Sequence, residues 1–199
     1  ANCFDECPWV LHVPSNTEVT IVGGDGGCEF CVQCTENELD FAPRLYAPSE
    51  CKCEFRGEGT LNETSTRIVR TVFDKSNAPY SRMVLGEVVG FPGKWSSYPP
   101  HYHPQPEIYH YRTLPKNGCG YCDLGNEILR VENNDTVMIS KGQIHPHVTA
   151  PGYALWYLWV IRHLENAPYI QPEFVKEHEW VMDKNAKIWP ESCLKRKSC

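Results

Sequence analysis

The chain of 199 residues lacks several features that mark particular classes of protein. No apolar run approaches the ~20 residues that a membrane-spanning helix requires, so we expect no membrane span. The N-terminal residues show no basic region followed by an apolar one, so we expect no signal peptide. The chain has 19 basic and 25 acidic residues, and this acidic balance argues against nucleic acid as a partner.

Cysteine is the residue type in excess, with 11 in the chain. A disulfide framework is disfavoured by the odd count and by a length that supports a core without covalent staples. Structural zinc could use Cys28, Cys31 and Cys34, but alternation along a strand would place Cys31 on the opposite face. The pair Cys119 and Cys122 lies at a turn rather than at a helix N-terminus, where a redox motif would need it. We therefore predict small free thiols in a reducing cytoplasm.

Short strands and turns dominate the predicted secondary structure. The chain contains 16 prolines and 14 glycines, and most of its apolar segments are short and end at turn residues. Evenly spaced short strands are typical of an all-β sandwich or barrel. The best candidate helix, 171–181, has weak periodicity. The predicted strands are 9–13, 18–22, 28–34, 67–73, 83–91, 107–112, 119–123, 128–131, 136–140, 147–149 and 154–161.

Three residues with metal-binding side chains share one face of a predicted strand. His101 and His103 are two residues apart, and Glu107 has the same parity. Two imidazoles and a carboxylate suit a borderline divalent metal ion. A fourth ligand should come from another strand, and His145 is the candidate. The pattern therefore predicts a metal site.

This pattern resembles the two sequence motifs of the cupin superfamily. The first motif places H-x-H and a following glutamate between two glycines, and the second ends in G-x2-H. The second motif here has Ser140 in place of the usual proline and lacks the usual asparagine. The resemblance implies a double-stranded β-helix, the cupin barrel. The matching residues are Gly93, His101, His103, Glu107, Gly118, Gly142 and His145.

A narrower resemblance is to the 5-deoxy-glucuronate isomerases of myo-inositol catabolism. It is carried by Trp95-Ser-Ser-Tyr-Pro-Pro-His-x-His, by Glu107-Ile-Tyr-x-Tyr-Arg, and by the apolar stretch 150–160. This resemblance implies conversion of 5-deoxy-glucuronate to 5-dehydro-2-deoxy-gluconate. The related 5-keto-4-deoxyuronate isomerases bind zinc through the same ligand types, so we expect zinc first, with manganese and iron as alternatives.

The resemblance also implies a chain derived from two cupins. We expect a remnant of an N-terminal cupin over residues 1–40, a metal-binding cupin over 41–165 and a loop-rich tail over 166–199. The chain departs from the family in the short connection between His103 and Glu107, in its reduced first cupin and in having a histidine at position 147.

The isomerase interpretation assigns roles to further residues. A proton must move between C2 and C1 of the sugar, so a general acid or base is needed near the metal. We predict Tyr109, His147 and Lys141 as catalytic residues. A cation or hydroxyl should hold the substrate, and we predict Lys94, Tyr111 and Arg112 as substrate-binding residues, although strand parity points Arg112 away from the barrel interior.

Other functions also fit a cupin. The chain could isomerise another uronate, carry out iron-dependent dioxygenase chemistry, or bind a sugar acid without catalysis. A small sugar acid is the expected ligand in the first and last of these. Because a reduced first cupin should leave a strand edge unpaired, we also predict a homodimer or larger homo-oligomer.

Overall fold

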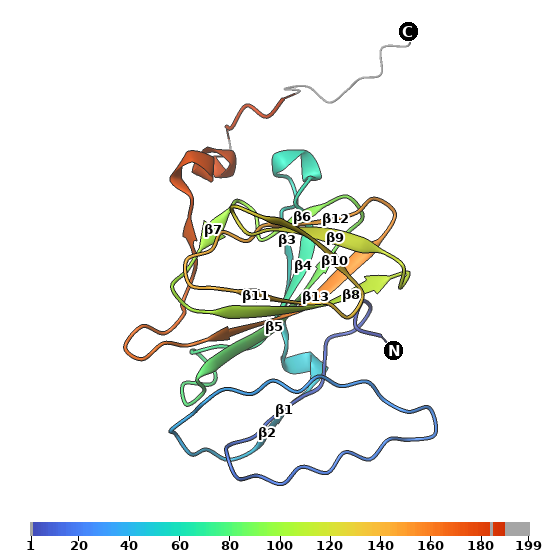
Figure 1. Ribbon diagram of the computed structural model, residues 1–199, viewed down its shortest axis with the longest axis vertical. Helices are drawn as coiled ribbons and strands as arrows, with labels where there is room; N and C mark the ends of the chain where they lie inside the picture. The colour runs from blue at the N-terminus through green and yellow to red at the C-terminus, as the bar shows by residue number, and fades with distance from the viewer. Residues whose placement is uncertain (1, 184, 190–199) are drawn as a thin grey trace.

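The computed structural model describes residues 2–183 and 185–189, and it consists mainly of two facing antiparallel sheets (Figure 1). The larger sheet has six strands and the smaller has four. In spatial order the larger sheet contains β11 (Thr136–Ile139), β8 (Glu107–Leu114), β13 (Ala154–Arg162), β5 (Met83–Gly90), β4 (Arg67–Phe73) and β3 (Lys52–Arg56). The smaller sheet contains β10 (Ile128–Glu132), β9 (Cys119–Asp123), β12 (His147–Thr149) and β6 (Trp95–Ser96).

Two strand pairs and three short 3-10 helices complete the described part of the chain. β1 (Val10–His12) pairs with β2 (Arg44–Tyr46), and β7 (His101–Tyr102) pairs with β14 (Glu173–Phe174). None of the helices in the described ranges has the length and apolarity that a membrane crossing requires. The helices are η1 (Pro48–Glu50), η2 (Leu61–Glu63) and η3 (Lys176–Met182).

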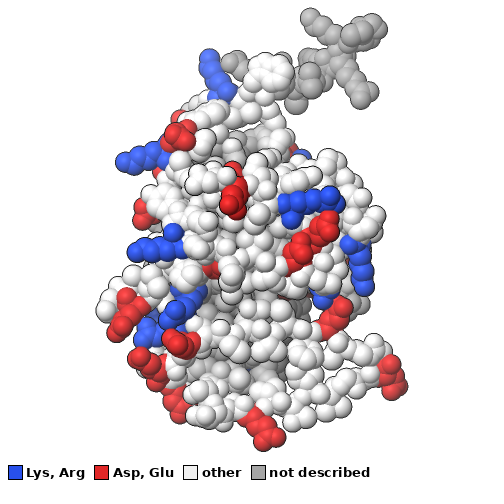
Figure 2. Space-filling view, in the orientation of Figure 1, with Lys and Arg blue, Asp and Glu red and all other residues white. Residues whose placement is uncertain are grey.

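On the face seen in Figure 2, basic and acidic side chains are interspersed.

The six-stranded sheet has a different core on each of its faces. Alternation along β8 shows how the sequence achieves this, because Tyr109 and Tyr111 are buried while Ile108 and Leu114 are exposed. The inner face packs against the smaller sheet through a cluster that includes Val69, Val88, Tyr109, Tyr111, Cys122, Val131 and Tyr157.

The outer face of the larger sheet packs against the N-terminal part of the chain. Its buried residues include Phe73, Leu85 and Trp156, and Phe4 and Val10 from the N-terminal segment lie against them. Figure 1 shows β1, β2 and the long loop that joins them next to the β5 side of the sheet. β1 lies before position 40 and β2 after it, and the two strands pair with each other. The division of the chain expected at position 40 stays a prediction.

Most predicted strands form, but three predictions are wrong. Residues 18–22 and 28–34 form no strand, because these extended segments have no neighbouring strand to pair with among the described residues. Residues 171–181 do not form the expected α-helix, and instead contain β14 and most of η3. Of the described cysteines, all nine are free thiols, whereas Cys193 and Cys199 lie outside the described residues.

Candidate metal centre

The first histidine motif is not carried on a single strand, contrary to the sequence-based expectation. β7 ends at Tyr102, and β8 begins only at Glu107. Pro104 and Pro106 lie between them, and proline cannot donate to a strand ladder, so the chain turns here. The turn places the His103 side chain next to that of Glu107, the first residue of β8.

A backbone hydrogen bond joins the second motif to the first. The backbone N–H of Gly142 donates to the carbonyl oxygen of His103 at 3.0 Å. Gly142 has a φ of 76°, a conformation that favours glycine, so the turn before His145 depends on this residue. This contact positions His145 beside His103 although 41 residues separate them in the sequence (145 minus 103, less one).

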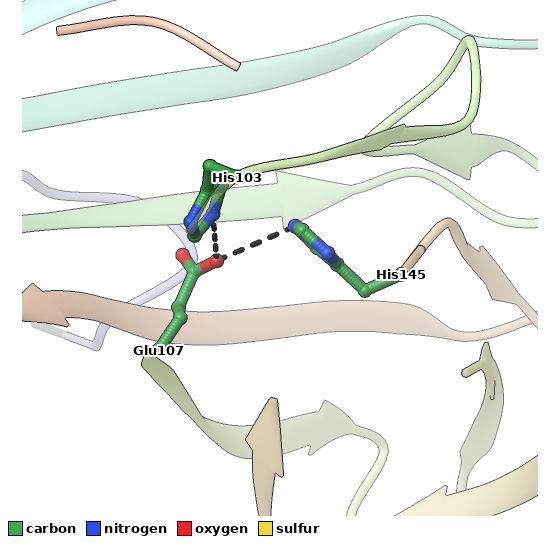
Figure 3. A group of neighbouring side chains, drawn as sticks. All are labelled: His103, Glu107 and His145. Carbon is green, nitrogen blue, oxygen red and sulfur yellow. Dashed lines mark hydrogen bonds and ion pairs between the residues drawn. The ribbon is translucent and has the colours of Figure 1, made fainter. Parts of the chain in front are cut away.

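His103, Glu107 and His145 form one buried group (Figure 3). Oε2 of Glu107 lies 3.0 Å from Nε2 of His103 and 3.3 Å from Nε2 of His145. The three candidate ligand atoms all lie within 4.8 Å of one another, which is the spacing of atoms that could surround one ion. Among the described residues, no other group of three histidine, cysteine or acidic side chains meets this spacing.

Backbone carbonyl groups orient the imidazole rings for metal binding. Nδ1 of His103 lies 2.9 Å from the carbonyl oxygen of Gln105, and Nδ1 of His145 lies 2.8 Å from that of Gln143. A carbonyl oxygen can only accept, so each Nδ1 carries the hydrogen and each Nε2 presents a lone pair. Nε2 of His145 is buried and makes no hydrogen bond within the described structure, despite its nearness to Glu107. The donor set and its orientation therefore fit a divalent ion such as zinc.

His101 lies at the edge of this group. Its ring stands edge-on to that of His145, with centroids 4.8 Å apart, and its Nδ1 lies 3.1 Å from the carbonyl oxygen of Pro99. Burial lowers the pKa of His101 and of His145 to about 4, so both rings are neutral at neutral pH, as metal ligands must be. His101 falls outside the tight group of three, and its predicted role as a metal ligand stays a prediction.

The metal group opens on a cavity of about 410 Å³ along the inner face of the larger sheet. Tyr109 lines this cavity, and its hydroxyl lies 3.3 Å from the hydroxyl of Ser97. Burial raises the pKa of Tyr109 well above its ordinary value, so the side chain keeps its proton. The other lining residues near the metal group include His101, His103, Glu107, Tyr157, Trp159 and Tyr169.

His147 and Tyr111 lie behind the cavity wall rather than on it. His147 is fully buried, with its Nδ1 hydrogen-bonded to the carbonyl oxygen of His145 and its Nε2 to the hydroxyl of Tyr111. Both ring nitrogens are occupied, and burial lowers the pKa of His147 to about 3. This position supports a role in holding His145 in place, and does not support the acid–base role expected for His147 or substrate contact by Tyr111.

The three predicted cationic residues do not reach the cavity. Lys94 donates to the carbonyl oxygen of Glu63, and Lys141 is exposed in the turn before Gly142. Arg112 points to the outer side of β8, where it contacts Asn134 and lies 3.5 Å from Glu29. Lys94 and Lys141 neighbour the two motifs in sequence, but neither side chain lines the cavity.

Among the cavity residues that the sequence does not point to, Tyr169 and Arg67 lie near the predicted ligands. Tyr169 comes from the C-terminal segment, and its ring lies edge-on to His103 with centroids 5.0 Å apart. Arg67 begins β4 and lines the cavity from the larger sheet. No spacing relation links either residue to the histidine motif. The only available signal was strand parity, which places Arg67 on the same face as Val69.

The two facing sheets and the buried His–Glu group define a cupin with a candidate metal centre, and the predicted fold class is confirmed. The model of the KduI/IolB family matches residues 1–181. The chain belongs to this family, which confirms the resemblance seen in the sequence.

Individual relatives agree with this assignment. The 5-deoxy-glucuronate isomerase of Geobacillus thermodenitrificans is 32% identical over 193 residues, which cover 88% of this chain and 66% of the relative. The 5-deoxy-glucuronate isomerase of Lacticaseibacillus casei is 31% identical over 166 residues, covering 72% of this chain and 56% of the relative. The crystal structure of an IolB-like protein from Salmonella typhimurium superposes with a TM-score of 0.65 at 26% identity, covering 74% of this chain and 58% of that one. The chain thus spans about two thirds of these relatives or less.

Proposed function

We propose that this protein is a divalent-metal-dependent isomerase that converts 5-deoxy-glucuronate to 5-dehydro-2-deoxy-gluconate. The observation that carries the proposal is the buried group of His103, Glu107 and His145 beside a sugar-sized cavity. The family assignment and the names of the relatives support the choice of reaction and substrate. Zinc is the proposed ion because the donors are imidazole and carboxylate, with manganese and iron as alternatives.

The chain's own side chains suit the chemistry of such a reaction. An aldose becomes a ketose when a proton leaves C2 and a proton reaches C1, with negative charge on the sugar oxygens between these events. A bound divalent ion supplies Lewis-acid stabilisation of that charge. Tyr109 holds its proton in the cavity, so its hydroxyl can donate to a sugar oxygen or return a proton. The aromatic side chains of Tyr157, Trp159 and Tyr169 also line the cavity and offer apolar surfaces against which a sugar ring can pack.

The test is a paired measurement of metal content and ketose formation. Purified wild-type protein should contain a divalent metal by elemental analysis and should form ketose from 5-deoxy-glucuronate. His103→Ala should lose both, because it removes a ligand from the buried group. His110→Ala is the matched control, since His110 lies on the outer side of β8 and contacts Thr136. Full turnover by metal-free His103→Ala protein would overturn the mechanism.

A non-catalytic sugar-acid-binding cupin is the second candidate. The observation in its favour is that the chain spans only 66% of the Geobacillus thermodenitrificans relative, so parts needed for turnover could be missing. Thermal stabilisation by 5-deoxy-glucuronate without ketose formation would support this function over the isomerase. Turnover of a different uronate in the same assay would retain the isomerase class and change the substrate.

A further inference from the structure

A cationic side chain without an acidic partner lies on the inner wall of the cavity. Arg67 is partly buried at the start of β4, and its guanidinium contacts only backbone and hydroxyl oxygens. Nη1 donates to the carbonyl oxygen of Ser65 at 2.7 Å and to its hydroxyl at 3.1 Å, and Nη2 donates to the carbonyl oxygen of Tyr98 at 3.4 Å. No acidic residue in the described ranges forms an ion pair with it.

The hydrogen bonds of Arg67 leave donors free. A guanidinium has five N–H groups, and three hydrogen bonds engage Arg67, so two N–H groups have no acceptor. One of them is on Nε, which is buried and unpartnered. Nε is enclosed by the protein, so the remaining N–H of Nη2 is the donor left for a carboxylate in the cavity. Burial lowers the pKa of Arg67, which means that its charge is poorly compensated by its present surroundings.

Arg67 lies close to the metal group. It lines the same cavity as His101, His103 and Glu107. Arg67 donates to the carbonyl oxygen of Tyr98, while Nδ1 of His101 hydrogen-bonds that of Pro99, the next residue along the chain. The guanidinium and the His101 ring are therefore held by the carbonyl groups of two adjacent residues.

The other cations of the cavity wall have their own partners. Lys52 and Arg56 lie 3.4 Å and 2.7 Å from the carboxylate of Glu54. Lys75 donates to the carbonyl oxygen of Pro79, in the loop beyond the opposite end of β4. Arg67 is therefore the cation of the described cavity wall that combines nearness to His101 with an uncompensated charge.

We propose that Arg67 binds the carboxylate of the sugar acid and thereby places the other end of the sugar at the metal group. The proposal rests on the proposed function, because it assumes a ligand that carries a carboxylate at the end remote from the reacting carbons. It assigns Arg67 as the residue that selects acidic sugars over neutral ones.

The experiment compares a charged ligand with its neutral counterpart. Suitable probes are the C1-reduced forms of 5-deoxy-glucuronate and of its carboxamide, which bind without being isomerised. Titration calorimetry on the metal-loaded wild-type protein should give roughly 10- to 100-fold tighter binding of the acid, the range for a charge-assisted pair. In Arg67→Met this preference should fall to about one, with metal content unchanged. Arg67→Lys should keep part of it, because the charge remains and the planar fork is lost.

Lys75→Met is the matched control, since it removes a cation from the same cavity. It should leave the preference for the acid intact, and loss of the preference in this variant would overturn the proposal. Equal binding of acid and amide by the wild-type protein would also overturn it, and this comparison requires no variant to fold. If ligand binding depends on Arg67 but the wild type forms no ketose, the isomerase function is wrong and the carboxylate site stands. If the wild type forms ketose but Arg67→Met keeps the preference for the acid, the carboxylate site is wrong and the isomerase function stands.

Discussion

Two arginines of β4 lie three residues apart and face opposite sides of the same sheet. Arg70 is on the outer face, where only 4% of its side chain is exposed, and it pairs with Glu87 at 3.2 Å. It also donates to the backbone carbonyl oxygens of Cys3, Phe4 and Glu6. Arg67 is on the inner face and has no carboxylate among the described residues. Both leave Nε unpartnered, so the difference between them is the anionic partner.

The two faces of this sheet separate residues that stabilise the fold from residues that can bind a ligand. The outer face is closed by the N-terminal segment, so a charge there must be neutralised within the chain. The inner face carries a cavity, so a charge there can be neutralised by an anionic ligand that binds in the cavity. Residues of the outer face should therefore affect the free energy of unfolding, and residues of the inner face should affect catalysis and binding.

The largest effect should come from the inner face at Tyr109. Tyr109→Phe removes the hydroxyl that faces the cavity and lies 3.3 Å from Ser97. A positioned acid–base group contributes typically 10²- to 10⁴-fold, so kcat for 5-deoxy-glucuronate should fall by about that factor. Denaturant unfolding should change by only about 1 kcal/mol, the contribution of one hydrogen bond.

Tyr102→Phe is the control for that substitution, because the Tyr102 hydroxyl is exposed and contacts Glu173 outside the cavity. It should leave kcat unchanged. A Tyr109→Phe protein with wild-type kcat would show that the hydroxyl takes no part in proton transfer. It would leave the metal group as the sole catalytic feature of the inner face.

On the outer face, Arg70→Met should mainly reduce stability. It leaves the buried carboxylate of Glu87 without its cation and removes the donors that hold the N-terminal segment. Breaking a buried pair from one side costs about 3–5 kcal/mol, which urea unfolding can measure. kcat per folded molecule should remain unchanged. The double variant Arg70→Met with Glu87→Gln should recover part of the loss, and a loss below 1 kcal/mol in the single variant would contradict this view of the outer face.

The sequence predicts the strands well where alternation and pairing agree. The predicted bounds of β4, β9 and β12 match the structure residue for residue. Residues 28–34 have the same strand-like composition, but composition does not reveal whether a neighbouring strand exists. The failure there is a missing partner rather than a misread pattern.

The candidate site divides in the same way. His103, Glu107 and His145 were predictable because metal ligands need particular atoms at characteristic spacings. Arg67 was not, because its importance lies in the absence of a partner, and no sequence pattern records an absence. Lys94 and Lys141 are the cations nearest to the motifs along the chain, but Lys94 donates to the carbonyl oxygen of Glu63 and Lys141 is exposed.

The smallest predicted effect concerns His12, a histidine of β1 that packs on the outer face. Its ring stacks on Phe73 with centroids 4.5 Å apart, and its other ring neighbours are Phe41 and Tyr80. Burial of the ring lowers the pKa of His12. As the pH falls below 6.5, the ordinary value, the unfolded chain takes up a proton before the folded chain does. Stability should therefore decrease as the pH falls through this region.

His12→Phe isolates this contribution from the inner-face histidines, whose pKa values are also lowered. Phenylalanine fits among the three aromatic neighbours and removes the buried Nδ1 that has no hydrogen-bond partner in the described structure. The variant should be about 1 kcal/mol more stable than wild type at pH 7, and its advantage should grow between pH 6.5 and pH 5. Urea unfolding at several pH values measures both. A constant difference across this range would mean that the folded protein protonates His12 freely, and that the outer face is less tightly closed around β1 than its packing indicates.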